Sequence, residues 1–226
     1  MRIFQREIDR LKKTVLSLSA RVEETVRRAV NAIDRRDVAL AQHVIEHDAD
    51  IDNAEIEIEE ECLKILALHQ PVAVDLRFVV SCLKINNDLE RIGDRAASIA
   101  ECALALARTV RVDIPFDFIG MADKVQTMLK LSIDALVNFD PDLARSVCAM
   151  DDDVDAIHRE MYDLVKDAIR DQPSGLDGFV RFLTVSRHLE RIADHATNIA
   201  EDVLYMLSGE IVRHGPGRLP GNGGEK

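Results

Sequence analysis

The feature that most restricts the fold of this 226-residue sequence is an internal repeat. Three pairs of segments match: 44–52 with 147–155 at an offset of 103 residues, and 89–94 with 189–194 and 99–101 with 199–201 at an offset of 100 residues. The second pair reads LERIGD in the first half and LERIAD in the second. Such self-similarity indicates that one structural unit occurs twice, so we expect two homologous halves.

Each half carries apolar residues at alternating spacings of three and four, which is the pattern of an amphipathic helix. The clearest runs cover 4–33, 40–65, 85–106 and 118–139. Four prolines, which are costly inside a helix, punctuate these runs: Pro71, Pro115, Pro141 and Pro173. Asp37 and Asp140 stand just before two of the expected helices and are predicted to cap them.

The sequence therefore predicts an all-α protein of two tandem antiparallel three-helix bundles, with six long helices, because short connections make consecutive helices neighbours. We expect the first three-helix repeat over 1–109 and the second over 114–208. Residues 209–226 hold six of the ten glycines and are predicted to form a disordered tail. One continuous coiled coil is the alternative, but it fits neither the prolines nor the repeat.

The composition argues against several classes of partner. A net charge of −12 and a pI near 5.0 would repel a phosphate backbone, so no nucleic acid is expected as a direct partner. The first residues lack an apolar signal segment, and no apolar run approaches the 18 or so residues that span a bilayer. We therefore expect a cytoplasmic protein without membrane insertion, with its four widely spaced cysteines reduced and mostly buried.

The candidate site is a set of carboxylate pairs at i, i+4, so that the members of each pair share one helix face. The four pairs are Asp48/Asp52, Glu90/Asp94, Asp151/Asp155 and Glu190/Asp194. Two carboxylates one turn apart repel each other, and a bound cation would relieve that repulsion. Each half has a pair on its second and its third helix, and the two would converge if those helices pack at the same height. The alternative is a solvated acidic face, neutralised by Arg91 or Arg95.

Oxygen ligands would select hard cations such as Mg²⁺, Ca²⁺, Mn²⁺ or oxidised iron rather than zinc. On the third helix, Glu90, Asp94 and Glu101 are expected to be exposed, opposite the core residues. The histidines are scattered, although His195 follows Asp194 and could approach a bound metal. No phosphate-binding glycine loop and no nucleophile motif is present, so we do not expect an enzyme.

Two tandem three-helix repeats, each with acidic pairs on its second and third helices, resemble the PhoU family over residues 1–208. The most specific features are the LERIGD and LERIAD segments and the Gln-Pro closures at 70–71 and 172–173. The resemblance implies a cytoplasmic accessory protein of the phosphate ABC transporter. It also implies a negative regulator of the phosphate-starvation response that links the transporter to a sensor histidine kinase, and a homodimer.

The same resemblance implies that metal ions bind at the acidic pairs, with iron, manganese or magnesium as candidates. The implied ligands are Asp48, Asp52, Glu90, Asp94, Asp151, Asp155, Glu190 and Asp194. Glu55 and Glu59 extend the first set, whereas their counterparts are His158 and Tyr162, so the two sites are expected to differ in occupancy. The alternative functions are a metal-storage or metal-dependent carboxylate bundle and a helical scaffold without a ligand.

Overall fold

The computed structural model describes residues 2–112 and 117–209, and these residues form only helices, turns and short connections. The helices are α1 (Arg2–Arg35), α2 (Val38–Glu46), α3 (Asp48–His69), α4 (Ala73–Leu106), α5 (Phe118–Asn138), α6 (Pro141–Asp171), the 3₁₀ helix η1 (Pro173–Gly175) and α7 (Leu176–Ser208). The predicted all-α fold of two tandem three-helix bundles is confirmed. Pro115 and the predicted tail, apart from Gly209, lie outside the described residues.

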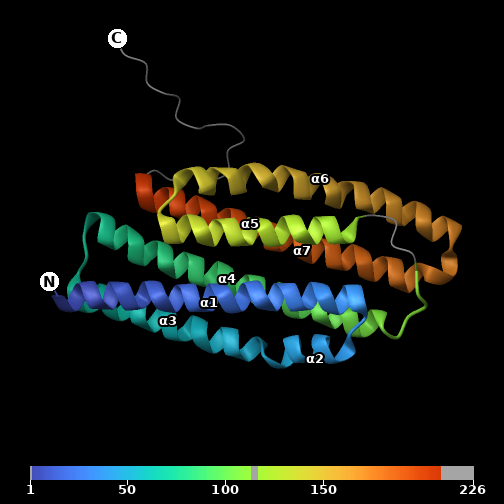
Figure 1. Cartoon of the computed structure of the whole chain (residues 1–226), viewed down its shortest axis with the longest axis horizontal. Helices are drawn as coiled ribbons and strands as arrows, with labels where there is room; N and C mark the ends of the chain where they lie inside the picture. The colour runs from blue at the N-terminus through green and yellow to red at the C-terminus, as the bar shows by residue number, and fades with distance from the viewer. Residues whose placement is uncertain (1, 113–116, 210–226) are drawn as a thin grey trace, which may run out of the picture.

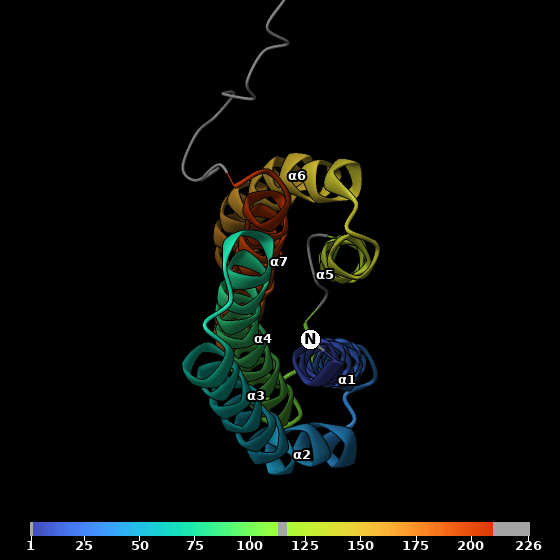
Figure 2. The same ribbon diagram turned by 90° about the vertical axis from the view of Figure 1, so that its left-hand side faces the viewer.

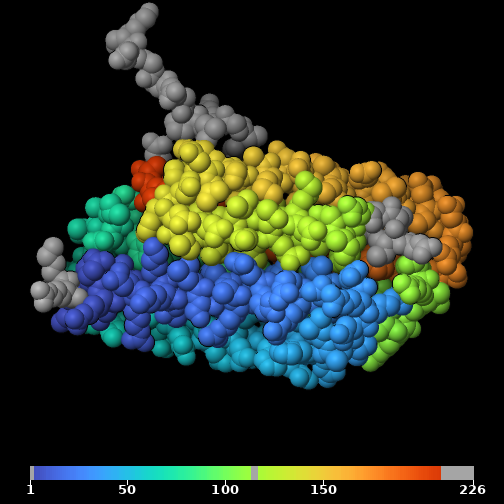
Figure 3. Space-filling view, viewed as in Figure 1, coloured from blue at the N-terminus to red at the C-terminus, as the bar shows by residue number. Residues whose placement is uncertain are grey.

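The two repeats, α1–α4 and α5–α7, pack side by side and share one core (Figure 1). Seen from the end, α6, α7, α4 and α3 form a curved layer, and α1 and α5 lie against its inner side (Figure 2). In the space-filling view α1 and α5 lie beside each other on one face of the molecule (Figure 3). The last helices of the two repeats, α4 and α7, therefore form the centre of the fold.

The predicted second helix is interrupted at His47, where the structure divides it into α2 and α3. The His47 ring Nδ1 lies 2.8 Å from the carbonyl oxygen of His43, which also accepts from the backbone N–H of His47 at 3.2 Å, so ring and backbone share one acceptor of the helix. In the second repeat Met150 occupies the corresponding position, and α6 runs through it without a break. A methionine side chain offers no competing donor of this strength.

The predicted caps are confirmed. The Asp37 carboxylate accepts a hydrogen bond of 3.0 Å from the backbone N–H of Leu40 at the start of α2. Asp140 accepts from the backbone N–H groups of Asp142 and Leu143 at the start of α6, and Pro141 occupies the first turn of that helix. Both side chains satisfy N–H groups that have no partner inside their own helix.

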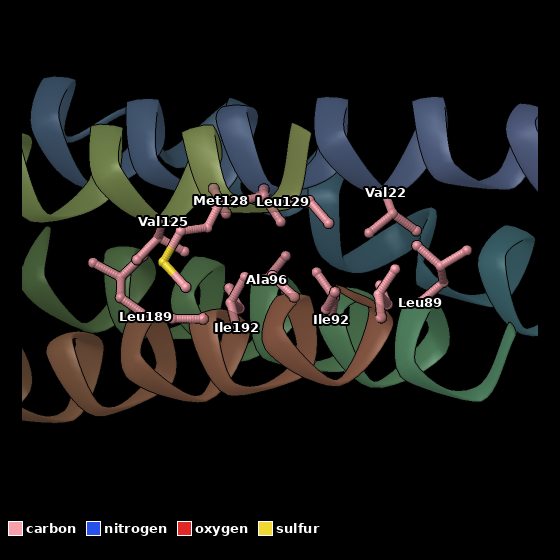
Figure 4. Close-up of a cluster of buried hydrophobic side chains, with 14 of the residues drawn as sticks. Val22, Leu89, Ile92, Ala96, Val125, Met128, Leu129, Leu189 and Ile192 are labelled. Atoms are coloured by element: carbon pink, nitrogen blue, oxygen red, sulfur yellow. The ribbon is translucent and has the colours of Figure 1, made fainter. Parts of the chain in front are cut away.

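The core runs without interruption from one repeat to the other. In Figure 4, side chains from α1, α4, α5 and α7 meet in a single apolar cluster that includes Val22, Leu89, Met128 and Ile192. All four of these residues are fully buried. Three of the cysteines are buried and Cys148 is half-buried, all four thiols are free, and burial raises the pKa of Cys62 to about 12.

The close approach of α3 to α4 depends on Gly93. A Cβ atom at this position would lie 3.1 Å from two side-chain carbons of Ile51. The second repeat has the smaller Val154 in place of Ile51, and there an alanine, Ala193, occupies the glycine position. The two repeats thus reach the same helix packing with different pairs of side chains.

Polar contacts fix the two repeats relative to each other. Between α4 and α7, Asp88 accepts from Asn198 at 3.2 Å and lies 2.8 Å from His195 Nδ1. One turn away, Lys84 pairs with the buried Asp202 at 2.9 Å. Among the described residues, no helix is both long and apolar enough to cross a bilayer.

Candidate metal sites

The structure brings three carboxylates of the first repeat together at the boundary between α3 and α4. One oxygen from each of Asp52, Glu90 and Asp94 lies within 4.8 Å of the other two. Asp52 follows the buried Ile51 on α3, and Glu90 follows the buried Leu89 on α4, so the core contacts of both helices bring these carboxylates to the same seam. Within the parts of the chain that the structure describes, this is the only such group of histidine, cysteine or acidic side chains.

We call the set around this seam the first acidic cluster; it consists of Asp48, Asp52, Glu55, Glu90 and Asp94. Burial, followed by the charges of Asp52 and Asp94, raises the pKa of Asp48. Burial and then Asp94 likewise raise the pKa of Glu90. Each of these shifts means that a negative charge is unfavourable here unless a cation compensates it.

Two oxygen atoms of the first acidic cluster are buried without a hydrogen-bond partner. They are Oδ1 of Asp48 and Oε2 of Glu90, and the latter has only a loose ion pair of 3.5 Å with Arg91. The expectation that Glu90 and Asp94 are exposed is wrong, because α3 packs beside them and leaves both half-buried. Glu101, beyond the cluster, is exposed as expected.

Sequence reasoning missed Asn86, which holds Glu55 at the edge of the cluster. Asn86 is fully buried, and its Nδ2 donates to the backbone oxygen of Glu55 at 2.9 Å and to Oε1 of the same residue at 3.1 Å. The sequence did contain an indication of its role, because Asn86 is an amide at a core-facing position of the helix, between the apolar residues Cys82 and Leu89. A buried amide in such a position needs polar partners; Glu55 supplies them for the NH2 group, whereas Oδ1 of Asn86 is buried without a hydrogen-bond partner.

The second acidic cluster consists of Asp151, Asp155, Glu190 and Asp194, on α6 and α7. Burial and then the charges of Asp194 and Asp155 raise the pKa of Asp151 to about 6. Arginines pair with three members: Arg191 lies 3.0 Å from Asp194 and 3.5 Å from Glu190, and Arg159 lies 4.0 Å from Asp155. This cluster is therefore partly neutralised by the protein itself.

Two histidines lie near the second acidic cluster. His195 does not point to the cluster through Nδ1, because that nitrogen faces Asp88 of the first repeat. His158 lies 2.8 Å through Nδ1 from the hydroxyl of the fully buried Ser186. Ser186 occupies the position of Asn86, and His158 the position of Glu55, so the same two places carry different chemistry in the two repeats.

The residues of the first acidic cluster fit a hard cation. They offer several carboxylates from two helices, two buried oxygens without a hydrogen-bond donor, and a net negative charge that a cation would offset. The second cluster offers the corresponding carboxylates, but among the described residues no three of their oxygens come within 4.8 Å of one another, and arginines already lie beside them. The predicted assignment of all eight residues as ligands stays a prediction.

Comparison with known proteins matches both halves of the chain. The model of the PhoU domain matches residues 15–103 and 118–203. A Clostridium acetobutylicum protein named as a phosphate-specific transport system accessory protein PhoU homolog is 33% identical over 212 residues, which cover 93% of this chain and 97% of that protein.

Two solved structures share the fold. The crystal structure of PhoU from Pseudomonas aeruginosa has a TM-score of 0.87 at 37% identity, covering 92% of this chain and 100% of that chain. The phosphate transport system regulatory protein PhoU from Streptococcus pneumoniae has a TM-score of 0.86 at 30% identity, covering 92% and 99%. With both repeats matched over nearly their whole length, this chain belongs to the PhoU family.

Proposed function

We propose that this protein is a non-catalytic cytoplasmic regulator that reports phosphate sufficiency by contacting a phosphate ABC transporter and its sensor histidine kinase. The observation that carries the proposal is the match of both repeats to the PhoU domain, in a chain similar to proteins named as accessory to phosphate transport. In this role it acts as a homodimer and represses the phosphate-starvation response when phosphate is plentiful.

Metal binding at the acidic clusters is the second part of the proposal. Carboxylates of both clusters hold the ions, with iron, manganese or magnesium as the candidates. Supporting it are the buried oxygens of Asp48 and Glu90 that lack hydrogen-bond donors and the raised pKa of Asp48, Glu90 and Asp151. A bound cation would supply the positive charge that lets α3 and α4 keep these carboxylates together.

The acidic surface also suits basic partner surfaces. The chain carries 41 acidic and 29 basic side chains besides histidine, a surplus that attracts a basic partner and speeds encounter. Metal at a cluster would change the local charge that such a partner meets. The regulator could in this way respond to metal as well as to its partners.

Reporter expression in the native host tests the regulatory part. Deleting the gene should leave alkaline phosphatase high in phosphate-rich medium, and the wild-type gene should restore repression. A variant carrying Glu90→Ala, Asp94→Ala, Glu190→Ala and Asp194→Ala should fail to restore it. The matched control is Glu57→Ala with Glu60→Ala, which removes charge from exposed positions of α3 outside the cluster.

The outcomes separate the candidate functions. Repression that persists in the deletion strain would overturn the negative-regulator proposal. If the purified protein then carries several ions per chain by elemental analysis, the metal-storage bundle becomes the better reading of the first acidic cluster. If the four-fold variant represses normally while the deletion does not, regulation stands and the acidic pairs have no part in it.

A further inference from the structure

A matched difference between the two repeats lies along the boundary where α4 packs against α7. The two helices run antiparallel there, and three contacts fix their register: Arg77 with Met206, Ser81 with Asp202, and Asp88 with His195. This register places Arg95 of α4 opposite His188 of α7. Because these helices match at an offset of 100 residues, Arg95 and His188 correspond to His195 and Asp88.

The half of the boundary around Asp88 balances its own charges, and we call it the paired half. Asp88 accepts from Asn198 at 3.2 Å and lies 2.8 Å from Nδ1 of His195. Lys84 pairs with the buried Asp202 at 2.9 Å. Each carboxylate of the paired half therefore has a partner within the protein.

The matching half of the boundary carries positive charge and no carboxylate. In the order of the chain, the positions Ser81, Lys84, Asn87, Asp88, His195 and Asp202 correspond to Arg181, Thr184, Arg187, His188, Arg95 and Cys102. We call Arg95, Arg181, Arg187 and His188 the basic half. Both acidic residues of the paired half thus have uncharged counterparts or a histidine here, and two neutral residues have arginines.

Arg95 has a buried donor without an acceptor. Its side chain is half-buried, and its Nε lies in the interior with no hydrogen-bond partner. Arg91, one turn earlier on α4, pairs with Glu90, whereas Arg95 forms no ion pair with any residue that the structure describes. A buried donor that lacks an acceptor is costly, and it indicates a place where a water or an ion binds.

The neighbours of Arg95 in the basic half are also positive. Burial lowers the pKa of His188, and the two charges that act on the ring, those of Arg95 and Arg187, lower it further. Farther along the boundary, burial raises the pKa of Cys102 and the nearby Arg181 opposes that rise. The basic half is therefore a local concentration of positive charge in a chain whose net charge is −12.

We propose that the basic half binds a tetrahedral oxyanion, with inorganic phosphate as its ligand. Arg95 and Arg187 hold the anion through their guanidinium groups, and His188 donates a ring N–H. The anion takes the role that the Asp88 carboxylate has in the paired half. This inference goes beyond the proposed function, because it gives the chain a phosphate site of its own that requires neither metal nor partner.

The chemistry of the basic half suits a small phosphate. A guanidinium group presents a planar set of N–H donors that matches two oxygens of a phosphate. Partial burial of Arg95 strengthens such a charge-assisted hydrogen bond, because the local dielectric constant is lower than that of water. The acidic residues elsewhere on the chain repel a small anion only weakly, since salt screens charges beyond about 8 Å at physiological ionic strength.

Equilibrium dialysis of the metal-free full chain against radiolabelled phosphate tests the inference. A chelator removes metal beforehand, so that phosphate held by an ion at an acidic cluster is not counted. We expect a single phosphate per chain, displaced by sulfate, which has the same tetrahedral shape, more readily than by acetate. Circular dichroism checks that each variant is folded.

The sharpest variant copies the paired half. His188→Asp places a carboxylate opposite Arg95, as Asp88 lies opposite His195. Arg95 then has an acceptor inside the protein, and the variant should lose phosphate binding although both arginines of the site remain. Phosphate should raise the melting temperature of the wild type and leave that of His188→Asp unchanged.

Removal of Arg95 tests the same site from the other side. Arg95→Gln should weaken phosphate binding at least about tenfold, the loss expected for one hydrogen bond to a charged group. Arg170→Gln is the matched control, because it removes the same charge from an exposed arginine of α6 that pairs with Asp167, and it should leave the phosphate affinity unchanged. In nitrogen-15 NMR, the Nε–H signal that is lost in Arg95→Gln should shift when phosphate is added to the wild type.

Three results would overturn the inference. An unchanged phosphate affinity in both His188→Asp and Arg95→Gln would mean that phosphate binds elsewhere. Binding that appears only with added Mn²⁺, and disappears in Asp52→Asn with Asp94→Asn, would assign the phosphate to a metal at the first acidic cluster. No phosphate binding by the wild type would also refute the site, while the regulatory proposal would stand, since reporter expression tests it separately.

Discussion

The first and second acidic clusters occupy the same places in two copies of one helical unit, yet their surroundings differ. In the first, Asp52, Glu90 and Asp94 come within 4.8 Å of one another. In the second, Arg191 and Arg159 pair with all three of the corresponding carboxylates. The repeat conserves where the carboxylates stand, whereas the neighbouring side chains decide whether their charge is already balanced.

A single substitution contributes to this difference in charge between the two clusters. Arg159 of α6 corresponds to Ile56 of α3, which is exposed and uncharged. Arg191 has a counterpart in Arg91, but Arg91 lies 3.5 Å from Glu90, whereas Arg191 reaches both Glu190 and Asp194. The first cluster thus keeps more uncompensated charge, and we expect it to gain more from a cation.

The largest expected effect is on metal-induced stability. At 100 times its Kd, Mn²⁺ should add about 2.7 kcal/mol to the free energy of unfolding, or roughly 5–10 °C in Tm. Asp52→Asn with Asp94→Asn should remove most of this shift, and Asp155→Asn with Asp194→Asn should remove less. Differential scanning fluorimetry with and without Mn²⁺ measures it, and equal losses from both variants would contradict the comparison.

The next largest expected effect is on stability, at the contact between α3 and α4. Gly93→Ala should lower the free energy of unfolding by about 1–2 kcal/mol, because the new Cβ meets Ile51 at 3.1 Å. Combining it with Ile51→Val copies the second repeat and should recover most of the loss. Urea denaturation measures both variants. A single variant as stable as the wild type would show that α3 and α4 adjust without cost.

The contribution of the second acidic cluster to the free energy of unfolding should change with pH by about 1 kcal/mol, after allowance for its partial exposure. The pKa of Asp151 is raised to about 6, so its folded form holds the proton more tightly than the unfolded chain does. That stabilisation is complete below about pH 4, the ordinary range for aspartate, and is lost as the pH rises through about 6.

Asp151→Asn should therefore abolish the loss of stability that the wild type shows between about pH 4 and pH 7. We expect the variant to be more stable than the metal-free wild type at pH 7 and similar to it near pH 4. Thermal melts of the metal-free proteins across this range provide the measurement. A variant whose melting temperature falls between pH 4 and pH 7 as steeply as that of the wild type would exclude Asp151 as the cause.

The smallest expected effect on stability comes from Arg159→Ile, which copies the first repeat. The ion pair with Asp155 is long and exposed, so its loss should change the free energy of unfolding by less than about 1 kcal/mol. Removing the arginine should nevertheless strengthen cation binding at the second cluster. Isothermal titration calorimetry detects this, with Arg145→Ala, on the same helix and paired with Asp142, as the control.

Much of the fold follows from the sequence because helix signals are local. The spacing of apolar residues, the caps at Asp37 and Asp140 and the repeated segments indicate which residues are helical and which face of each helix is buried. The break at His47 was not predicted, since the spacing of apolar residues continues through it and does not report the local backbone conformation there. The exposure of Glu90 was also predicted wrongly, because periodicity along one helix does not show what packs beside it.

By itself, then, the sequence determined where the helices lie along the chain and that the unit is duplicated. It also determined that the two members of each carboxylate pair share a helix face, because the spacing of residues along a helix fixes the direction in which their side chains point. Only the tertiary structure decided that Asp52 meets Glu90 and Asp94, that Asn86 holds Glu55, and that Ser186 orients His158. These contacts join residues of different helices, and their distances depend on the height and separation at which the helices pack. Single side chains such as Gly93 and Ile51 set that packing, and no spacing rule along the chain specifies it.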